Sequence, residues 1–151
     1  MGTITIMSDV RLWQLISSTL PVGAYAYSGG LESAVEHGHV HNFVSCQEWL
    51  AGLLAESFSF NDLPMYLRLY DLWEKQDIAG VVLACEKLQS MRETQELLAE
   101  DRQTGAALQR LMIDLDIEDA GTISQPSFAV MFALACVRWQ VTRLDGAHGL
   151  V

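Results

Sequence analysis

The chain has 151 residues, of which half are apolar and 19% are charged. This length suits one domain, because compact domains cluster at roughly 100 to 150 residues, and the apolar content excludes an intrinsically disordered chain. Nineteen acidic residues against nine basic ones give a formal charge of −10. Such a surface repels phosphate backbones and anionic lipid, so we expect neither nucleic-acid nor membrane binding.

Targeting and redox features are also sparse in this sequence. The first ten residues contain no Lys or Arg, so we identify no signal or transit peptide there. The longest apolar run, residues 128–137, is much shorter than the ~20 residues that a membrane span requires. The three cysteines form no CxxC pair, which argues against a disulfide framework or a zinc motif. We therefore expect a cytoplasmic protein with buried thiols.

Apolar residues recur at intervals of three and four through most of the chain, and no segment alternates with period two. The sequence therefore predicts an all-α, single-domain bundle of about six or seven helices, with residues 1–7 a flexible start and 142–151 an atypical tail. Ser8, Ser45, Asn61 and Asp77 are the predicted helix caps or starts. The predicted helices span 8–20, 31–37, about 46–60, 61 to at least 73, 77 to at least 88, 94–115 and 127–141.

Two segments, 66–73 and 128–137, are apolar on nearly every helical face, so we expect them to be the most buried. Gly105 lies in the middle of the predicted 94–115 helix. A glycine there costs about 1 kcal/mol relative to alanine. We therefore expect another backbone to approach Gly105 closely.

No pattern in the sequence predicts an enzyme. The GxxxxGK[ST] loop, the HExxH motif and the EF-hand pattern are absent. Residues 26–30 come within one residue of a GxSxG nucleophile elbow, but that elbow requires a strand inside a parallel sheet. We therefore expect Ser28 to serve in a turn or a helix cap, and we expect no catalytic residue and no cofactor.

Three histidines, His37, His39 and His41, alternate across a predicted helix end. Imidazole is a good nickel or zinc ligand, and alternate residues of an extended segment point the same way. Solvated histidines on a loop are the commoner case. We expect no physiological metal site and keep a site at these histidines as the alternative.

The segment 22–32 combines three glycines with two tyrosines just before Glu32. One interpretation is an irregular connector that packs its tyrosines into the core. The other is a recognition surface, because glycines permit close approach and tyrosines are common anchors at interfaces.

Residues 12–15 and 20–32 closely resemble the amino-terminal signature of the UreF family of urease accessory proteins. Residues 62–64, 90–96 with 105–108, and 126–128 are similar to that family's next signatures, in the same order. The resemblance spans roughly residues 10–140. It departs at Gly29, at Met91 and in the tail 142–151, where the family continues through further helices, so the chain resembles a carboxyl-terminally truncated member.

The resemblance implies a non-catalytic, dimer-forming helical chaperone. Such a protein joins a UreD/UreH-type accessory protein and a UreG-type GTPase, modulates GTP hydrolysis by that GTPase, and helps to load nickel into apo-urease. The alternatives are an unrelated helical interaction module and a metal-binding protein that uses the three histidines. The expected partner contacts are Tyr25, Tyr27, Ser28, Gly30 and Glu32, with Arg92, Glu93 and Glu96 as a second set.

Overall fold

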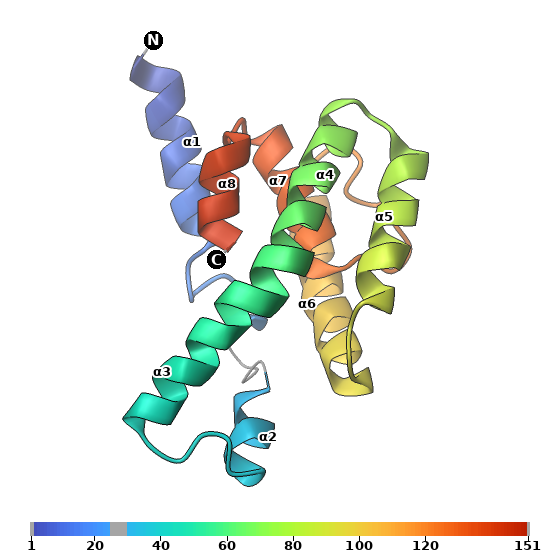
Figure 1. Cartoon of the computed structure of the whole chain (residues 1–151). Helices are drawn as coiled ribbons and strands as arrows, with labels where there is room; N and C mark the ends of the chain where they lie inside the picture. Colours follow the sequence, from blue (N-terminus) through green and yellow to red (C-terminus); the bar gives the residue numbers. More distant parts are fainter. Residues whose placement is uncertain (1, 25–29, 151) are drawn as a thin grey trace.

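The computed structural model describes residues 2–24 and 30–150. Every regular element within these residues is a helix, which confirms the all-α prediction (Figure 1). They form seven helical segments, because α3, the π-helical segment η2 and α4 make one unbroken run. None of the described helices is long and apolar enough to cross a membrane. The elements are α1 (Gly2–Leu15), α2 (Leu31–Glu36), α3 (Phe43–Gly52), η2 (Leu53–Asp62), α4 (Leu63–Glu74), α5 (Ile78–Ser90), α6 (Gln95–Asp114), α7 (Phe128–Arg138) and α8 (Arg143–Leu150).

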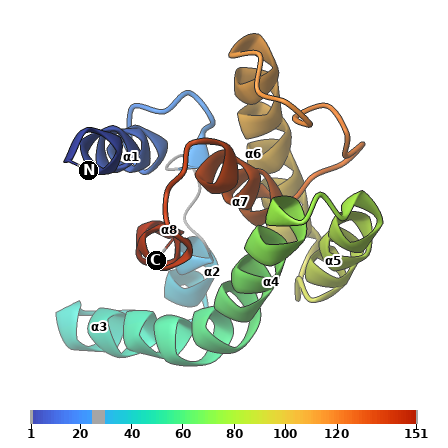
Figure 2. The same ribbon diagram turned by 90° about the horizontal axis from the view of Figure 1, so that it is seen from above.

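Helix α7 forms the centre of the core, and α4, α6 and α8 pack against it (Figure 2). Every residue from Val130 to Cys136 is at most 1% exposed. On α4, Tyr66, Leu69 and Trp73 are fully buried, and the Trp73 indole N–H donates to the Val130 carbonyl oxygen at 3.0 Å. These contacts confirm that the two most apolar segments form the core.

Helix α6 passes very close to the start of α7. A Cβ atom on Gly105 would lie 2.7 Å from the carbonyl carbon of Ser127 and 2.9 Å from the nitrogen of Phe128. This contact confirms the predicted close approach of another backbone. The predicted start of the helix is also confirmed, since Thr94 caps α6 and accepts a hydrogen bond from the Leu97 N–H at 3.2 Å.

The run from α3 to α4 begins earlier than predicted and continues through Asn61. Asn42 is the N-cap of α3: its side chain accepts from the Ser45 N–H at 2.9 Å, and the Ser45 hydroxyl accepts from the Asn42 N–H at 3.1 Å. The predicted cap at Ser45 and helix start at Asn61 are therefore wrong. Pro64 lies in the first turn of α4, as predicted. Because proline lacks an N–H and crowds the carbonyl four residues earlier, the wider π-helical turns of η2 let the helix pass it without a break.

Within residues 2–24 and 30–150, three helices end with a left-handed residue that is not glycine. Gln76, Asp116 and Gln140 follow α4, α6 and α7 with φ of 56°, 54° and 57°. After α7, the Val141 N–H donates to the Cys136 carbonyl oxygen at 2.9 Å, which is the outer hydrogen bond of a Schellman motif. Helix α7 therefore ends at Arg138, and the predicted end at Val141 is wrong.

The first and last helices lie side by side at one edge of the molecule (Figure 1). Helix α1 begins at Gly2 and ends at Leu15, so Ser8 lies inside it and the predicted 8–20 boundaries are wrong. Helix α8, which the sequence did not predict, packs against α1, α4 and α7 and buries Gly146 and Ala147. The flexibility of residues 1–7 and the atypical character of residues 142–151 remain predictions.

Candidate functional site

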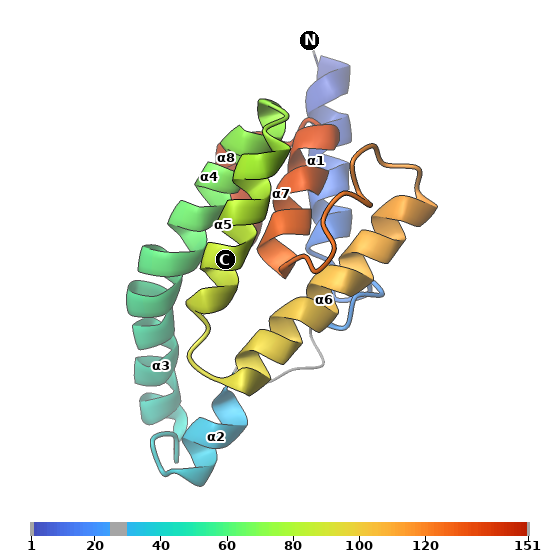
Figure 3. The ribbon, with the colours of Figure 1, turned by 90° about the vertical axis from the view of Figure 1, so that its right-hand side faces the viewer.

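A groove of about 920 Å³ is lined by residues from α2, the α3–η2 junction and the first half of α6. Figure 3 shows α2 close to the amino-terminal end of α6. Gly30 and Glu32 line one side of this groove, and Glu93 and Glu96 line another. The fold thus brings together four of the candidate contact residues, which come from two distant parts of the sequence.

The backbone explains how these residues reach the groove. Gly30 is the N-cap of α2 with a φ of 91°, a left-handed conformation that favours glycine. Glu32 lies in the first turn of α2. At the start of α6, hydrogen bonds from its own backbone N–H and from the Thr94 hydroxyl hold the pKa of Glu96 below its usual value. The Glu96 carboxylate is therefore ionised at neutral pH.

The described lining of this groove is strongly acidic and contains no Lys or Arg. Trp49, Leu53 and Leu97 add apolar surface between the carboxylates. Burial raises the pKa of Glu100, although the nearby Arg92 opposes the rise. A partner segment that presents basic side chains around an apolar one would match this lining. The acidic residues are Glu32, Glu36, Glu93, Glu96 and Glu100.

Arg92 lies next to the groove but does not line it. Its guanidinium pairs with Asp62 at 2.9 Å and with Asp101 at 3.4 Å. Asp101 also accepts from the Phe128 N–H at 3.1 Å, so this cluster joins the end of η2, the α5–α6 connection, α6 and the start of α7. Arg92 therefore supports the fold beside the groove.

The charges in this cluster perturb each other. Burial raises the pKa of Asp62, while the Arg92 guanidinium opposes the rise. Burial lowers the pKa of Arg92, but the carboxylates of Asp101 and Asp62 outweigh it and hold that pKa above its usual value. The arginine is therefore permanently charged between two half-buried or buried acids.

Sequence reasoning identified Arg92 but missed Asp101 as its partner. The available signal was periodicity, since Asp101 lies at helical spacing from Gly105, Leu108 and Met112 on the buried face of α6. A carboxylate on such a face requires a partner. The sequence alone could not show that the partner of Asp101 is Arg92, which lies in the connection before α6.

Three of the candidate contacts, Tyr25, Tyr27 and Ser28, lie outside the described residues. The described residues form no strand, so they supply no sheet for a nucleophile elbow around Ser28. The two interpretations of the glycine and tyrosine segment stay open.

Two of the three histidines line the groove. His37 and His39 line it with ring centroids 6.4 Å apart, whereas His41 does not line it. His37 donates from Nδ1 to the Ser33 carbonyl oxygen at 2.8 Å, and His41 donates to the Gly38 carbonyl oxygen at 3.3 Å. No group of three or more His, Cys, Asp or Glu within residues 2–24 and 30–150 could hold a metal ion.

A family model and individual related proteins identify the same family for this chain. The family model named UreF matches residues 40–151. The urease accessory protein UreF of Alkalilimnicola ehrlichii is 43% identical over 138 residues, which cover 89% of this chain and 60% of that protein. The proteins of the same name from Teredinibacter turnerae and Klebsiella pneumoniae are 43% and 41% identical, over 93% and 97% of this chain. The chain spans between 60% and 66% of the length of these three relatives.

Proposed function

This chain belongs to the UreF family, and on that premise we propose that it is a non-catalytic accessory protein of urease maturation. It acts in the cytoplasm as a scaffold for nickel insertion into apo-urease. There it joins a UreD/UreH-type partner to a UreG-type GTPase and modulates GTP hydrolysis by that GTPase. The observation that carries this proposal is the family match over residues 40–151, together with 43% identity to proteins named urease accessory protein UreF.

The acidic groove is the proposed partner contact of this scaffold. Its position supports the proposal, because Gly30 and Glu32, which line it, belong to the UreF-like signature at residues 20–32. Its charge is suited to a basic partner surface and gives electrostatic specificity. Tyr25 and Tyr27 precede it in sequence and belong to the same proposed contact.

We also propose that two copies of the chain associate. Phe43, Leu50, Leu54 and Phe60 are exposed apolar side chains along α3 and η2, and Phe43 and Phe60 are 75% and 76% exposed. Large exposed apolar surfaces mark interaction sites. Light scattering at micromolar concentration should give the dimer mass, and a constant monomer mass would contradict the association.

The accessory role can be tested by urease activation. Cells that contain the urease subunits and the other accessory proteins, but lack this chain, should gain nickel-dependent urease activity when it is supplied. Urease activity and nickel content of the purified urease are the two readouts. Absence of any gain from the wild-type chain would refute the accessory role.

The groove needs a separate comparison in the same cells. The variant Glu32→Gln/Glu93→Gln/Glu96→Gln should reduce activation at least fivefold, because it removes three charges from the groove. Its matched control, Glu74→Gln/Glu86→Gln/Glu118→Gln, removes three charges from exposed residues elsewhere and should stay within twofold of wild type. Both variants should keep the wild-type melting temperature. Equal loss of activation in the two variants would remove the groove from the proposal.

A further inference from the structure

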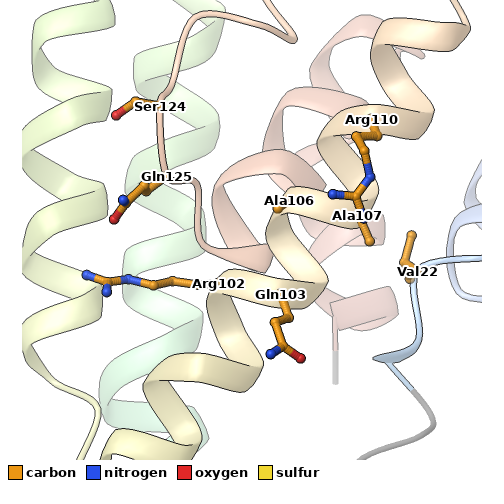
Figure 4. Close-up of a pocket in the computed structure, with 8 residues that line it drawn as sticks. All are labelled: Val22, Arg102, Gln103, Ala106, Ala107, Arg110, Ser124 and Gln125. Atoms are coloured by element: carbon orange, nitrogen blue, oxygen red, sulfur yellow. The ribbon is translucent and has the colours of Figure 1, made fainter.

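A second groove, of about 620 Å³, lies over the exposed face of α6 (Figure 4). Gln103, Ala106 and Ala107 line it from α6, the connection before α7 lines one side, and Val22 lines the other. Arg102 and Arg110 also line it, and Figure 4 shows Arg102 reaching toward Gln125 while Arg110 lies further along the helix. No carboxylate is among its described lining residues.

Arg102 and Arg110 form no ion pair with a described residue, which is also true of Arg11 and Arg68. Arg92, Arg138 and Arg143 each pair with at least one aspartate. No carboxylate of the described residues is in ion-pair range of Arg102 or Arg110. Arg102 and Arg110 are set apart because both line the same groove, where they place two positive charges on a chain of net charge −10.

Arg102 is also held in position before any partner arrives. Its Nε and Nη2 atoms donate to the Gln89 Oε1 atom at 3.0 and 2.8 Å. The Gln89 amide in turn donates to the Gln125 carbonyl oxygen at 2.7 Å. A guanidinium fixed in this way loses less conformational freedom on binding a carboxylate, which favours affinity.

We propose that this arginine-flanked groove binds an acidic helix of a partner protein. Ala106 and Ala107 let a helix backbone approach α6 closely. Arg102 and Arg110 are eight residues apart on one helix, so their Cα atoms are separated by about 12 Å along its axis. The partner therefore presents two carboxylates about two helical turns apart. This binding site adjoins the acidic groove, with which it shares Gln103, and the proposal does not depend on the accessory role.

The proposal can be tested with helical peptides and the whole chain. The probe is a fluorescein-labelled, alanine-rich helical peptide with two glutamates eight residues apart, and its control has glutamines at the same positions. Fluorescence anisotropy at low salt should show binding of the glutamate peptide, with at least tenfold weaker binding of the glutamine peptide. Equal binding of the two peptides would overturn the proposal.

Variants of the chain separate the groove from net charge. Arg102→Glu/Arg110→Glu should weaken binding of the glutamate peptide at least tenfold, whereas Arg68→Glu/Lys75→Glu, which changes the net charge equally at exposed residues outside the groove, should stay within threefold of wild type. Because Arg102 also bridges α5 and α6, Arg110→Glu alone is the decisive variant if the double variant melts at a lower temperature. Equal weakening by the groove variants and the control pair would show a general charge effect and refute the site.

Discussion

Replacing Gly105 with alanine sets two effects of opposite sign against each other. Helix propensity alone favours alanine by about 1 kcal/mol. The added Cβ atom would lie 2.7 Å from the Ser127 carbonyl carbon and 2.9 Å from the Phe128 nitrogen, and backbone atoms cannot rotate away as a flexible side chain can. Overpacking of this kind costs typically 1–3 kcal/mol, occasionally more. Moving Phe128 also strains the hydrogen bond from its N–H to Asp101, so we expect a net loss of about 2 kcal/mol.

The matched control for Gly105→Ala is Gly52→Ala. Gly52 has helical backbone angles, and nothing lies within 4 Å of its added Cβ atom. Alanine there should raise the free energy of unfolding by about 0.4–1 kcal/mol. Urea denaturation followed by circular dichroism at the helical band measures both free energies, and the melting temperature of Gly105→Ala should fall by roughly 4–8 °C. If Gly105→Ala were as stable as wild type, the steric reasoning would be wrong.

Three further changes test the interior charges and the histidines. Arg92→Ala leaves the buried Asp101 without its cation, so the free energy of unfolding in urea should fall by about 2–4 kcal/mol, and an unchanged value would contradict the ion cluster. Burial raises the pKa of Cys136 to about 12 from its ordinary value of 9.0, so the unfolded chain loses this proton first and stability falls as pH rises above 9. By pH 11 the Cys136→Ala variant should therefore gain about 2–3 kcal/mol relative to wild type, compared with their difference at pH 8, and a pH-independent difference would contradict the raised pKa. Replacing His37, His39 and His41 together with alanine should leave the melting temperature nearly unchanged, and calorimetric nickel binding that disappears with this change would instead support a metal site.

Several signals contained in a single helix were read correctly from the sequence, although the predicted start and end of the first helix were not. Asp77 opens α5 and accepts the Gly80 N–H at 2.9 Å, as its position before an apolar repeat indicated. The burial of α4 and α7 followed from side chains that are apolar on nearly every face. The close approach at Gly105 was predictable because a mid-helix glycine has an energetic cost that packing must offset.

Helix boundaries were predicted wrongly where two neighbouring residues could each serve as the cap or where the usual stop residue is missing. Asn42 and Ser45 are both good cap residues three positions apart, and the structure uses them reciprocally with Asn42 at the cap. The end of α7 carries glutamine, not glycine, in the left-handed position, so no glycine marks the end of that helix. The groove between α2 and α6 depends on tertiary packing, which no local pattern encodes.

Helix α6 carries residues that stabilise the fold and residues that line the two grooves, and these two sets lie on different faces of the helix. Its buried face carries Asp101 and Gly105, which fix the helix against α7. Its exposed face carries Glu96 at the acidic groove and Arg102 and Arg110 at the second groove. Substitutions on the buried face should therefore alter partner binding only in proportion to their effect on folding. Substitutions at Glu96 or Arg110 should alter binding at constant melting temperature, so measuring both quantities for each variant distinguishes a contact residue from a residue that only supports the fold.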